Sequence, residues 1–390
     1  MQIFFSAGEP SGDQHAAHLI HELRKQRPDI VSRGFGGPHM EEAGCRIDFM
    51  LTTMAVMGFF QILPMIRKFY HRVQHAEAIF RTEKPDAVVL VDFPGFNWWI
   101  ARKAKKYGIP VYYYLPPQLW AWASYRIRRV RKYVDHVLCA LPFEYDWYRD
   151  RGVKATYVGH PFFDEVDEKQ LDAPTMQAWE KYEGPLVAVL PGSRGSEIQN
   201  NWPIMLDVMR ELKESVPDVH FLVGSYKTKQ QQMCEQILAD SGYDLPLTFL
   251  QGKAPEVIEL GDCCLMVSGS ISLEVMARRT PAAVVYYVNR LTYILGTILI
   301  HCKYICLPNL MADREVMAEF PCTGRHEPIV RKLYGVLHGY LTDADLLKQK
   351  ADELEALRAT VFSTGASARV ANFLIEELET RSEQRIARAA

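Results

Sequence analysis

The chain has little net charge, no long apolar run and no cysteine pair with C-x-x-C spacing. Its 390 residues hold 45 Lys and Arg against 47 Asp and Glu, a formal net charge of −2, so we expect no nucleic-acid partner. No stretch reaches the ~20 apolar residues that a membrane-spanning helix requires. The eight cysteines form no C-x-x-C motif and several lie in apolar runs, which favours reduced thiols in the cytoplasm. No basic segment precedes the first apolar run, so we expect a strand there and not a signal peptide.

Metal ligands are also lacking, because no group of His, Cys, Asp and Glu has the spacing of a metal site. Asp343 and Asp345 spell a D-x-D, which holds a divalent ion in some sugar transferases. Here the pair follows Thr342 at the start of a predicted helix, where Asp is a common cap. We therefore expect neither a metal ion nor another cofactor.

Apolar stretches typical of buried parallel strands alternate with amphipathic helical patterns through most of the chain. The expected strands are 2–6, 87–91, 110–114, 134–140, 156–158, 186–190, 219–223, 247–250, 264–267 and 282–286. This alternation predicts an α/β protein in which two doubly wound, Rossmann-like domains face a cleft. We expect these domains at 1–165 and 185–330, joined by the polar, least structured segment 164–184, with further helices over 331–390.

Loops rich in Gly and Ser follow three of the expected strands. The clearest contains Ser193, Arg194 and Glu197, and similar loops lie at 6–13 and 268–270. A strand that ends in such a loop before a helix leaves backbone N–H groups facing a ligand, and the Arg194 guanidinium suits a phosphate or diphosphate. Because Gly and Ser also form ordinary turns, one loop alone does not decide between the two interpretations.

Asp92 ends an expected buried strand and is the first candidate for a general base. It either caps the following turn or faces the cleft, where Phe93 and Phe96 would remove its carboxyl from water and raise its pKa. Glu9 and Asp13 in the first loop are the other catalytic candidates, although Asp13 is somewhat better suited to capping the first helix.

Aromatic and charged residues after other strands are candidates for substrate binding. Trp120 and Trp122 precede a basic run that includes Arg126, which suits a sugar with an anionic substituent or, equally, a solvated helix face. His160 either contacts the ligand or fills the crossing between the domains. Glu274, on the first turn after the loop 268–270, either satisfies helix N–H groups or accepts both hydroxyls of a ribose.

An apolar segment at 54–70 ends in cations. Its helical spacing predicts packing on the sheet, but the apolar arc is wider than one core face needs, and the cations suit anionic lipid headgroups. The candidate membrane residues are Met57, Phe59, Phe60, Ile62, Leu63, Ile66, Arg67 and Lys68. A second apolar segment, 291–300, is compatible with core, dimer or membrane contact, and we favour protein contact.

The motifs, taken in order, resemble those of the lipid-A-disaccharide synthase family from residue 1 to about 380. They are SAGEPSGD (6–13), AVMG (55–58), DFPGFN (92–97), WAW (120–122), GHP (159–161), LPGSRGSE (190–197), SGS (268–270) with Glu274, and PN (308–309). The resemblance implies a glycosyltransferase of the GT-B fold that joins UDP-2,3-diacylglucosamine to 2,3-diacylglucosamine 1-phosphate (lipid X) through a β-1,6 linkage. UDP would be released, in the Gram-negative lipid A pathway.

The resemblance also implies where the substrates and the membrane bind. The residues that would hold UDP are Ser193, Arg194, Glu197, Ser268, Gly269, Ser270 and Glu274, with Asn309, Arg314 and Glu315 delivered from a partner subunit. The segment 54–70 would place the enzyme peripherally on the cytoplasmic face of the inner membrane. The implied dimer exchanges its C-terminal helices, which would otherwise pack back on the first domain.

Two other functions remain as alternatives. One is a different GT-B enzyme acting on UDP-sugars, such as a UDP-N-acetylglucosamine epimerase, which would need neither an apolar helix nor a second substrate. The other is a membrane-docked, nucleotide-binding scaffold without turnover, which would have no use for Asp92 facing the cleft.

Overall fold

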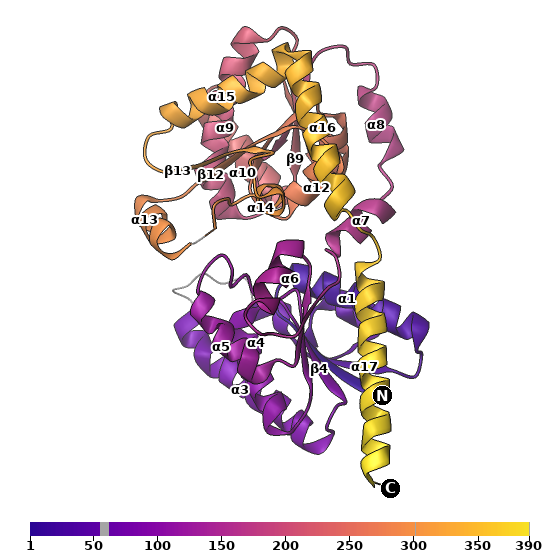
Figure 1. Ribbon diagram of the computed structural model, residues 1–390. Coiled ribbons are helices and arrows are strands. Elements are labelled where there is room, and N and C mark those ends of the chain that lie inside the picture. The colour runs from indigo at the N-terminus through magenta and orange to yellow at the C-terminus, as the bar shows by residue number, and fades with distance from the viewer. Residues whose placement is uncertain (55–61, 301, 390) are drawn as a thin grey trace. The chain divides into compact units, whose positions relative to one another are not determined.

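The computed structural model describes residues 1–54, 62–300 and 302–389. The chain divides into two units (Figure 1). Unit 1 comprises Met1–Asp164 and Ser363–Ala390, and unit 2 comprises Glu165–Phe362. The chain leaves unit 1 within one helix, α7 (Phe162–Glu168), and returns to it before the last helix, α17 (Ala366–Ala389).

Unit 1 is built on a parallel sheet in the order β3-β2-β1-β4-β5-β6-β7. Its strands are β1 (Gln2–Ala7), β2 (Val31–Gly36), β3 (Arg46–Met50), β4 (Ala87–Val91), β5 (Val111–Tyr114), β6 (His136–Cys139) and β7 (Ala155–Tyr157). The order reverses between β1 and β4, so the loops after these two strands diverge to opposite faces of the sheet. In doubly wound sheets such a switch point is where ligands bind.

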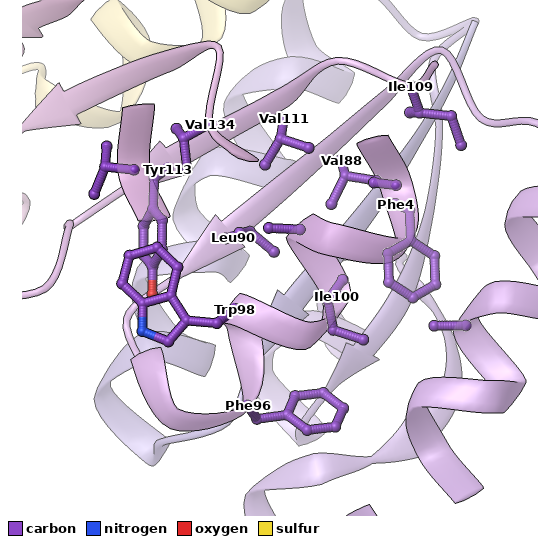
Figure 2. Close-up of a cluster of buried hydrophobic side chains, with 14 of the residues drawn as sticks. Phe4, Val88, Leu90, Phe96, Trp98, Ile100, Ile109, Val111, Tyr113 and Val134 are labelled. Atoms are coloured by element: carbon purple, nitrogen blue, oxygen red, sulfur yellow. The ribbon is translucent and has the colours of Figure 1, made fainter. Parts of the chain in front are cut away.

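Helices cover both faces of this sheet. They are α1 (Pro10–Gln26), α2 (Pro38–Glu42), α3 (Ile62–Thr82), α4 (Pro94–Lys106), α5 (Ile127–Tyr133) and α6 (Pro142–Arg149), together with α17 and the 3-10 turns η1 (Leu51–Met54) and η3 (Ser124–Arg126). Alternate residues of β1 enter opposite cores, so Phe4 packs on one face while Ile3 and Phe5 pack on the other. Figure 2 shows the first core, where Trp98 of α4 lies beside Tyr113 of β5.

The second core of unit 1 brings the two ends of the chain together. Helices α1 and α17 are neighbours (Figure 1). The buried residues Leu19 and Leu23 of α1 and Leu374 and Leu378 of α17 belong to one apolar cluster. Full burial of a leucine side chain stabilises a fold by about 1.5–3 kcal/mol. The last helix is therefore an integral part of unit 1.

Unit 2 repeats the plan with the sheet order β10-β9-β8-β11-β12-β13, again parallel throughout. Its strands are β8 (Leu186–Leu190), β9 (His220–Ser225), β10 (Leu247–Gln251), β11 (Cys263–Val267), β12 (Ala282–Tyr287) and β13 (Ala318–Cys322). Its helices are α8 (Ala173–Trp179), α9 (Gly195–Ser215), α10 (Thr228–Ser241), α11 (Ala254–Leu260), α12 (Ile271–Ala277), α13 (Arg290–Leu299), α14 (Leu307–Ala312), α15 (Glu327–Thr342) and α16 (Ala344–Val361). The switch point here lies between β8 and β11.

The α/β prediction with two doubly wound sheets is confirmed, but three strands were not predicted. In β2 two glycines and Arg33 interrupt the apolar pattern, and the guanidinium is buried because it pairs with Asp48 (2.7 Å) and Glu83. Strand β3 carries Asp48 itself, and β13 contains Pro321. A proline is tolerated in β13 because that strand forms the edge of its sheet.

The segment 164–184 is more ordered than expected. It contains most of α7 and the whole of α8, whose N-terminus is capped by Asp172 through a bond from the Thr175 N–H (3.0 Å). Asp343 likewise caps α16, as its position predicted. Among the described residues, no helix is both long and apolar enough to cross a bilayer.

Candidate active site

The predicted loops lie at the switch points of the two sheets. In unit 1 the Glu9 loop follows β1 and Asp92 follows β4, and these strands are neighbours in the sheet. In unit 2 the Arg194 loop follows β8 and the loop 268–270 follows β11, which are neighbours as well. Each pair therefore meets at the edge where ligands of doubly wound sheets bind.

Asp92 lies in a tightly packed turn of unusual backbone geometry. Asp92 and Phe93 both have positive φ, +49° and +45°. A Cβ on Gly12 would lie 3.6 Å from the Cβ of Asp92, and a Cβ on Gly8 would overlap the Phe93 ring. Removal from water raises the pKa of Asp92, while the backbone N–H of Phe93 and the nearby His15 oppose this shift. A raised pKa and a position at the switch point are features that many general bases share.

Asp13 does not cap its own helix. Its carboxylate accepts three backbone N–H groups at the start of α2, from Gly37 (2.6 Å), His39 (3.0 Å) and Met40 (3.2 Å). The side chain is 1% exposed. The expectation of a cap on α1 was therefore wrong, and Asp13 joins two helices. Glu9 is half-buried just before α1, which its side chain does not cap.

We expect Asp13→Ala to destabilise unit 1 by about 2 kcal/mol or more, because three backbone N–H groups in a largely buried setting lose their acceptor. Hydrogen exchange should accelerate at the amides of Gly37, His39 and Met40, and the urea midpoint should fall. Asp172→Ala is the matched control, because that cap is half exposed in unit 2 and its loss should leave exchange at 37–40 unchanged. Unaltered exchange in Asp13→Ala would contradict the assignment.

His160 is held as a neutral imidazole. Its Nδ1 accepts the backbone N–H of Phe162 (3.2 Å), so the proton lies on Nε2. Burial and the neighbouring His15, whose ring centroid is 6.2 Å away, lower the pKa of His160 to about 3. A neutral ring cannot act as a cation toward a phosphate, but its Nε2–H can donate a hydrogen bond to a sugar.

The two tryptophans have different surroundings. Trp120 donates from Nε1 to Oε1 of Glu144 (3.2 Å), and burial raises the pKa of that glutamate to about 8. Trp122 is exposed, and the guanidinium of Arg126 stacks on its ring at 4.8 Å. The structure therefore brings Trp122 and Arg126 together as a pair, whereas the indole N–H of Trp120 is bonded to Glu144.

The Arg194 loop binds a carboxylate of its own chain. Glu197 accepts the backbone N–H groups of Ser193 and Arg194 on Oε2 (both 3.1 Å), and its Oε1 pairs with the Arg194 guanidinium (2.9 Å). Two of the amides expected to face a phosphate are thus occupied. The amides of Gly195 and Ser196, which begin α9, have no partner among the described residues and remain available to an anion.

The loop after β11 leaves Gly269 and Ser270 exposed, and the hydroxyl of Ser268 donates to the Ile305 carbonyl (3.4 Å). Glu274 is buried, and burial raises its pKa. It does not satisfy helix N–H groups: Arg278 donates to its Oε1 from Nε and Nη2 (3.2 and 3.1 Å). Both bonds go to Oε1, so Oε2 takes no part in the pair with Arg278.

Residues 309–315 are engaged within unit 2. The amide of Asn309 is buried and donates to the Met317 carbonyl (2.8 Å) and to Glu319 (3.2 Å). Its Oδ1 accepts the N–H groups of Val316 (2.8 Å) and Met317 (2.9 Å), so its hydrogen-bonding capacity is filled. Arg314 is exposed and pairs with Glu353 (3.1 Å). A direct contact of Asn309 with a nucleotide would break hydrogen bonds that fix its own loop. The third predicted residue of this segment, Glu315, is exposed.

The predicted membrane segment is only partly described. Met57, Phe59 and Phe60 lie outside the described residues, as do the side chains of Ile62, Leu63 and Ile66 at the start of α3. Arg67 and Lys68 are exposed. In the second apolar segment, Ile294 and Leu299 of α13 are 56% and 55% exposed, so these two side chains do not belong to the core.

Comparison with known proteins points to one family. The family described as lipid-A-disaccharide synthetase matches residues 3–351. The lipid-A-disaccharide synthase of Myxococcus xanthus (strain DK1622) is 34% identical over 384 residues, covering 97% of each chain. Lipid-A-disaccharide synthase 1 of Legionella pneumophila (strain Philadelphia 1) is 31% identical over 383 residues, covering 98% of each.

Solved structures share the fold at low sequence identity. MnaA of S. aureus, solved with UDP, has a TM-score of 0.67 at 12% identity and covers 97% of this chain and 96% of its own. The UDP-GlcNAc 2-epimerase of Neisseria meningitidis, bound to UDP-GlcNAc, has a TM-score of 0.63 at 14% identity, with coverage of 96% and 99%. These similarities extend over both units and agree with the predicted GT-B fold.

Proposed function

Because the chain belongs to the lipid-A-disaccharide synthetase family, we propose that it transfers 2,3-diacylglucosamine from UDP to lipid X. The product is the β-1,6-linked lipid A disaccharide 1-phosphate, and UDP is released. The observation that carries this proposal is the pairing of loops at the switch points. A carboxylate with a raised pKa follows β4, and a glycine-rich loop with a guanidinium follows β8.

In this proposal Asp92 removes the proton from the primary hydroxyl of the acceptor. The hydroxyl oxygen attacks the anomeric carbon of the donor from the face opposite UDP, the bond from that carbon to the diphosphate breaks, and the configuration inverts. The raised pKa of Asp92 favours this proton transfer, because a base is most effective when its pKa approaches the working pH.

Unit 2 is assigned the leaving nucleotide. The Arg194 guanidinium is 73% exposed and its pair with Glu197 is correspondingly weak, about 1 kcal/mol or less, so a diphosphate can compete for it. The amides of Gly195 and Ser196 and the hydroxyl of Ser193 supply further donors at the N-terminus of α9, and Oε2 of Glu274 suits the ribose. Arg314 is a weaker candidate because Glu353 already neutralises it.

The acceptor and the membrane are assigned to unit 1. The pair of Trp122 and Arg126 offers an aromatic face beside a fixed cation, which suits the glucosamine phosphate of lipid X. The exposed Arg67 and Lys68 at the start of α3 suit the anionic cytoplasmic face of the inner membrane. We also propose a homodimer, supported by the exposed apolar residues of α13.

Turnover should not depend on a divalent ion, since Arg194 and the α9 amides carry the charge of the leaving group in this proposal. We expect EDTA to leave the rate of disaccharide formation within about twofold of the untreated enzyme. Removal of a metal ion that stabilised the leaving diphosphate would instead lower the rate by about 10²–10³-fold, as the loss of one such group does. The assay follows labelled lipid X into the disaccharide by thin-layer chromatography. Loss of activity in EDTA that Mg²⁺ restores would overturn the charge assignment.

Dependence on the acceptor separates this function from its alternatives. A disaccharide synthase releases UDP only when lipid X is present, and one UDP appears for each lipid X consumed. An epimerase would convert the UDP-sugar without lipid X, and a scaffold would release no UDP from the two substrates together.

A further inference from the structure

We propose that Asn97 and Tyr113 are positioning residues that hold Asp92 in its left-handed backbone conformation and so aim its carboxylate at the acceptor. The inference rests on the proposed role of Asp92 as the base. Neither residue contacts the substrate in this account; both act through the backbone of Asp92.

The conformation at Asp92 needs external support. Asp92 and Phe93 adopt left-handed φ angles in succession, and such angles bring the Cβ of an L-residue too close to the backbone. Asp tolerates this conformation better than most residues, but Phe does not. Relaxation of Asp92 from its φ of +49° to an ordinary φ near −60° would turn its side chain by about 110° around the N–Cα bond.

Asn97 supplies support from the first turns of α4. Its side chain is fully buried, and Nδ2 lies 2.7 Å from the Asp92 carbonyl, 3.2 Å from the Ser6 carbonyl and 3.3 Å from the Val91 carbonyl. Oδ1 accepts the hydroxyl of Ser6 (2.7 Å). One amide therefore joins the ends of β1 and β4, the two strands that flank the switch point.

Tyr113 supplies the second support from β5. Its hydroxyl donates to the same Asp92 carbonyl over 2.8 Å. Burial, with the nearby charge of Asp92, raises the pKa of Tyr113 well above its usual value, so the hydroxyl keeps its proton at every working pH. Two buried donors from different elements thus converge on the carbonyl of one strained residue.

A purely structural network would not need this convergence. The bond from the Ser6 hydroxyl to Asn97 already joins β1 to α4 without touching Asp92. The donors that reach the Asp92 carbonyl instead fix the peptide that follows the proposed base. Strained backbone that is held by its surroundings in this way is typical of catalytic positions.

The test uses two variants that alter this carbonyl's donors and one that does not. Asn97→Asp keeps the size of the side chain but replaces Nδ2 by an oxygen facing three carbonyls, and Tyr113→Phe removes one hydroxyl. We expect kcat to fall about 10–100-fold in Asn97→Asp and about 3–10-fold in Tyr113→Phe, because misplacement of a reacting group by about 1 Å is enough to slow a reaction by such factors. UDP affinity, measured by calorimetry, should stay within about twofold, because UDP is assigned to unit 2. The acid limb of the pH profile of kcat/KM should shift in both variants.

Tyr148→Phe is the matched control, since it removes a buried hydroxyl that donates to the Pro117 carbonyl (2.7 Å) and leaves both donors of the Asp92 carbonyl in place. We expect its kcat and acid limb to stay close to those of the parent even where its melting temperature falls. If Asn97→Asp fails to fold, Tyr113→Phe decides alone. The inference is overturned if a folded Asn97→Asp variant keeps the kcat and pH profile of the parent. If Asn97→Asp does not fold, the same result in Tyr113→Phe overturns it.

A double variant separates this inference from the assignment of the base. If Asn97 acts through Asp92, then adding Asn97→Asp to Asp92→Asn lowers the residual kcat by less than about threefold. If Asn97→Asp lowers kcat by the same factor in the parent and in Asp92→Asn, the positioning role is wrong, but the assignment of Asp92 as the base is unaffected. If Asp92→Asn alone keeps near-normal turnover, the assignment of the base fails first and the inference falls with it.

Discussion

Asp92→Asn is expected to lower kcat by about 10²–10⁴-fold, the usual contribution of a general base. Asn is nearly isosteric and retains an acceptor oxygen, so the turn after β4 should keep its left-handed geometry. The amide cannot take up the proton of the acceptor hydroxyl, however, and the attacking oxygen then stays neutral. UDP binding should remain within about twofold, because no residue assigned to UDP is altered.

Single-turnover kinetics with labelled lipid X would measure the chemical step directly, and calorimetry with UDP would show that the variant is folded. Glu9→Gln serves as the rival substitution, because Glu9 is the other candidate carboxylate at the same switch point. If Glu9→Gln abolishes turnover and Asp92→Asn does not, the roles of the two carboxylates are exchanged. A bell-shaped pH profile that loses its acid limb only in Asp92→Asn would identify the titrating group.

Arg194→Ala is expected to weaken UDP binding and to lower kcat/KM by about 10²–10³-fold, the cost of removing one preorganised donor from a developing negative charge. The loop itself should survive, because Glu197 still accepts the backbone N–H groups of residues 193 and 194. Arg194→Lys should recover only part of the loss, since an ammonium cannot form the planar, bidentate contact with a diphosphate.

Arg331→Ala is the matched control for this substitution. Arg331 is an exposed cation of α15 in the same unit, so its removal changes the net charge equally without altering the loop after β8. We expect calorimetry to give the parental UDP affinity for this variant. Equal losses in Arg194→Ala and Arg331→Ala would mean that UDP responds to the overall charge of unit 2 and not to a specific guanidinium.

The positions of the candidate loops could be predicted from the sequence, because short-range patterns determine them. An apolar strand followed by Gly, Ser and a helical pattern gave the loops at Glu9, Arg194 and Ser268. The reversal of strand order then places the Glu9 loop beside Asp92 and the Arg194 loop beside the Ser268 loop. Glu197, in the first turn of the following helix, was also a visible signal that a carboxylate of the chain itself could accept the loop's N–H groups, which the interpretation as a phosphate loop did not include.

Long-range hydrogen bonds could not be predicted in the same way. Asp13 caps a helix that begins 25 residues later, and Asn97 bonds to Ser6, 91 residues away. Such partners are set by which strands become neighbours, and no local pattern records that choice. Strand β2 was not predicted for a similar reason. Arg33 is compatible with a buried strand because Asp48 of β3 neutralises its charge.

The most direct test of the account is the stoichiometry of the purified enzyme with UDP-2,3-diacylglucosamine and labelled lipid X in the presence of EDTA. We expect one UDP released and one labelled disaccharide formed for each lipid X consumed, with neither product detectable when lipid X is omitted. Release of UDP without lipid X, or an absolute requirement for a divalent ion, would contradict it.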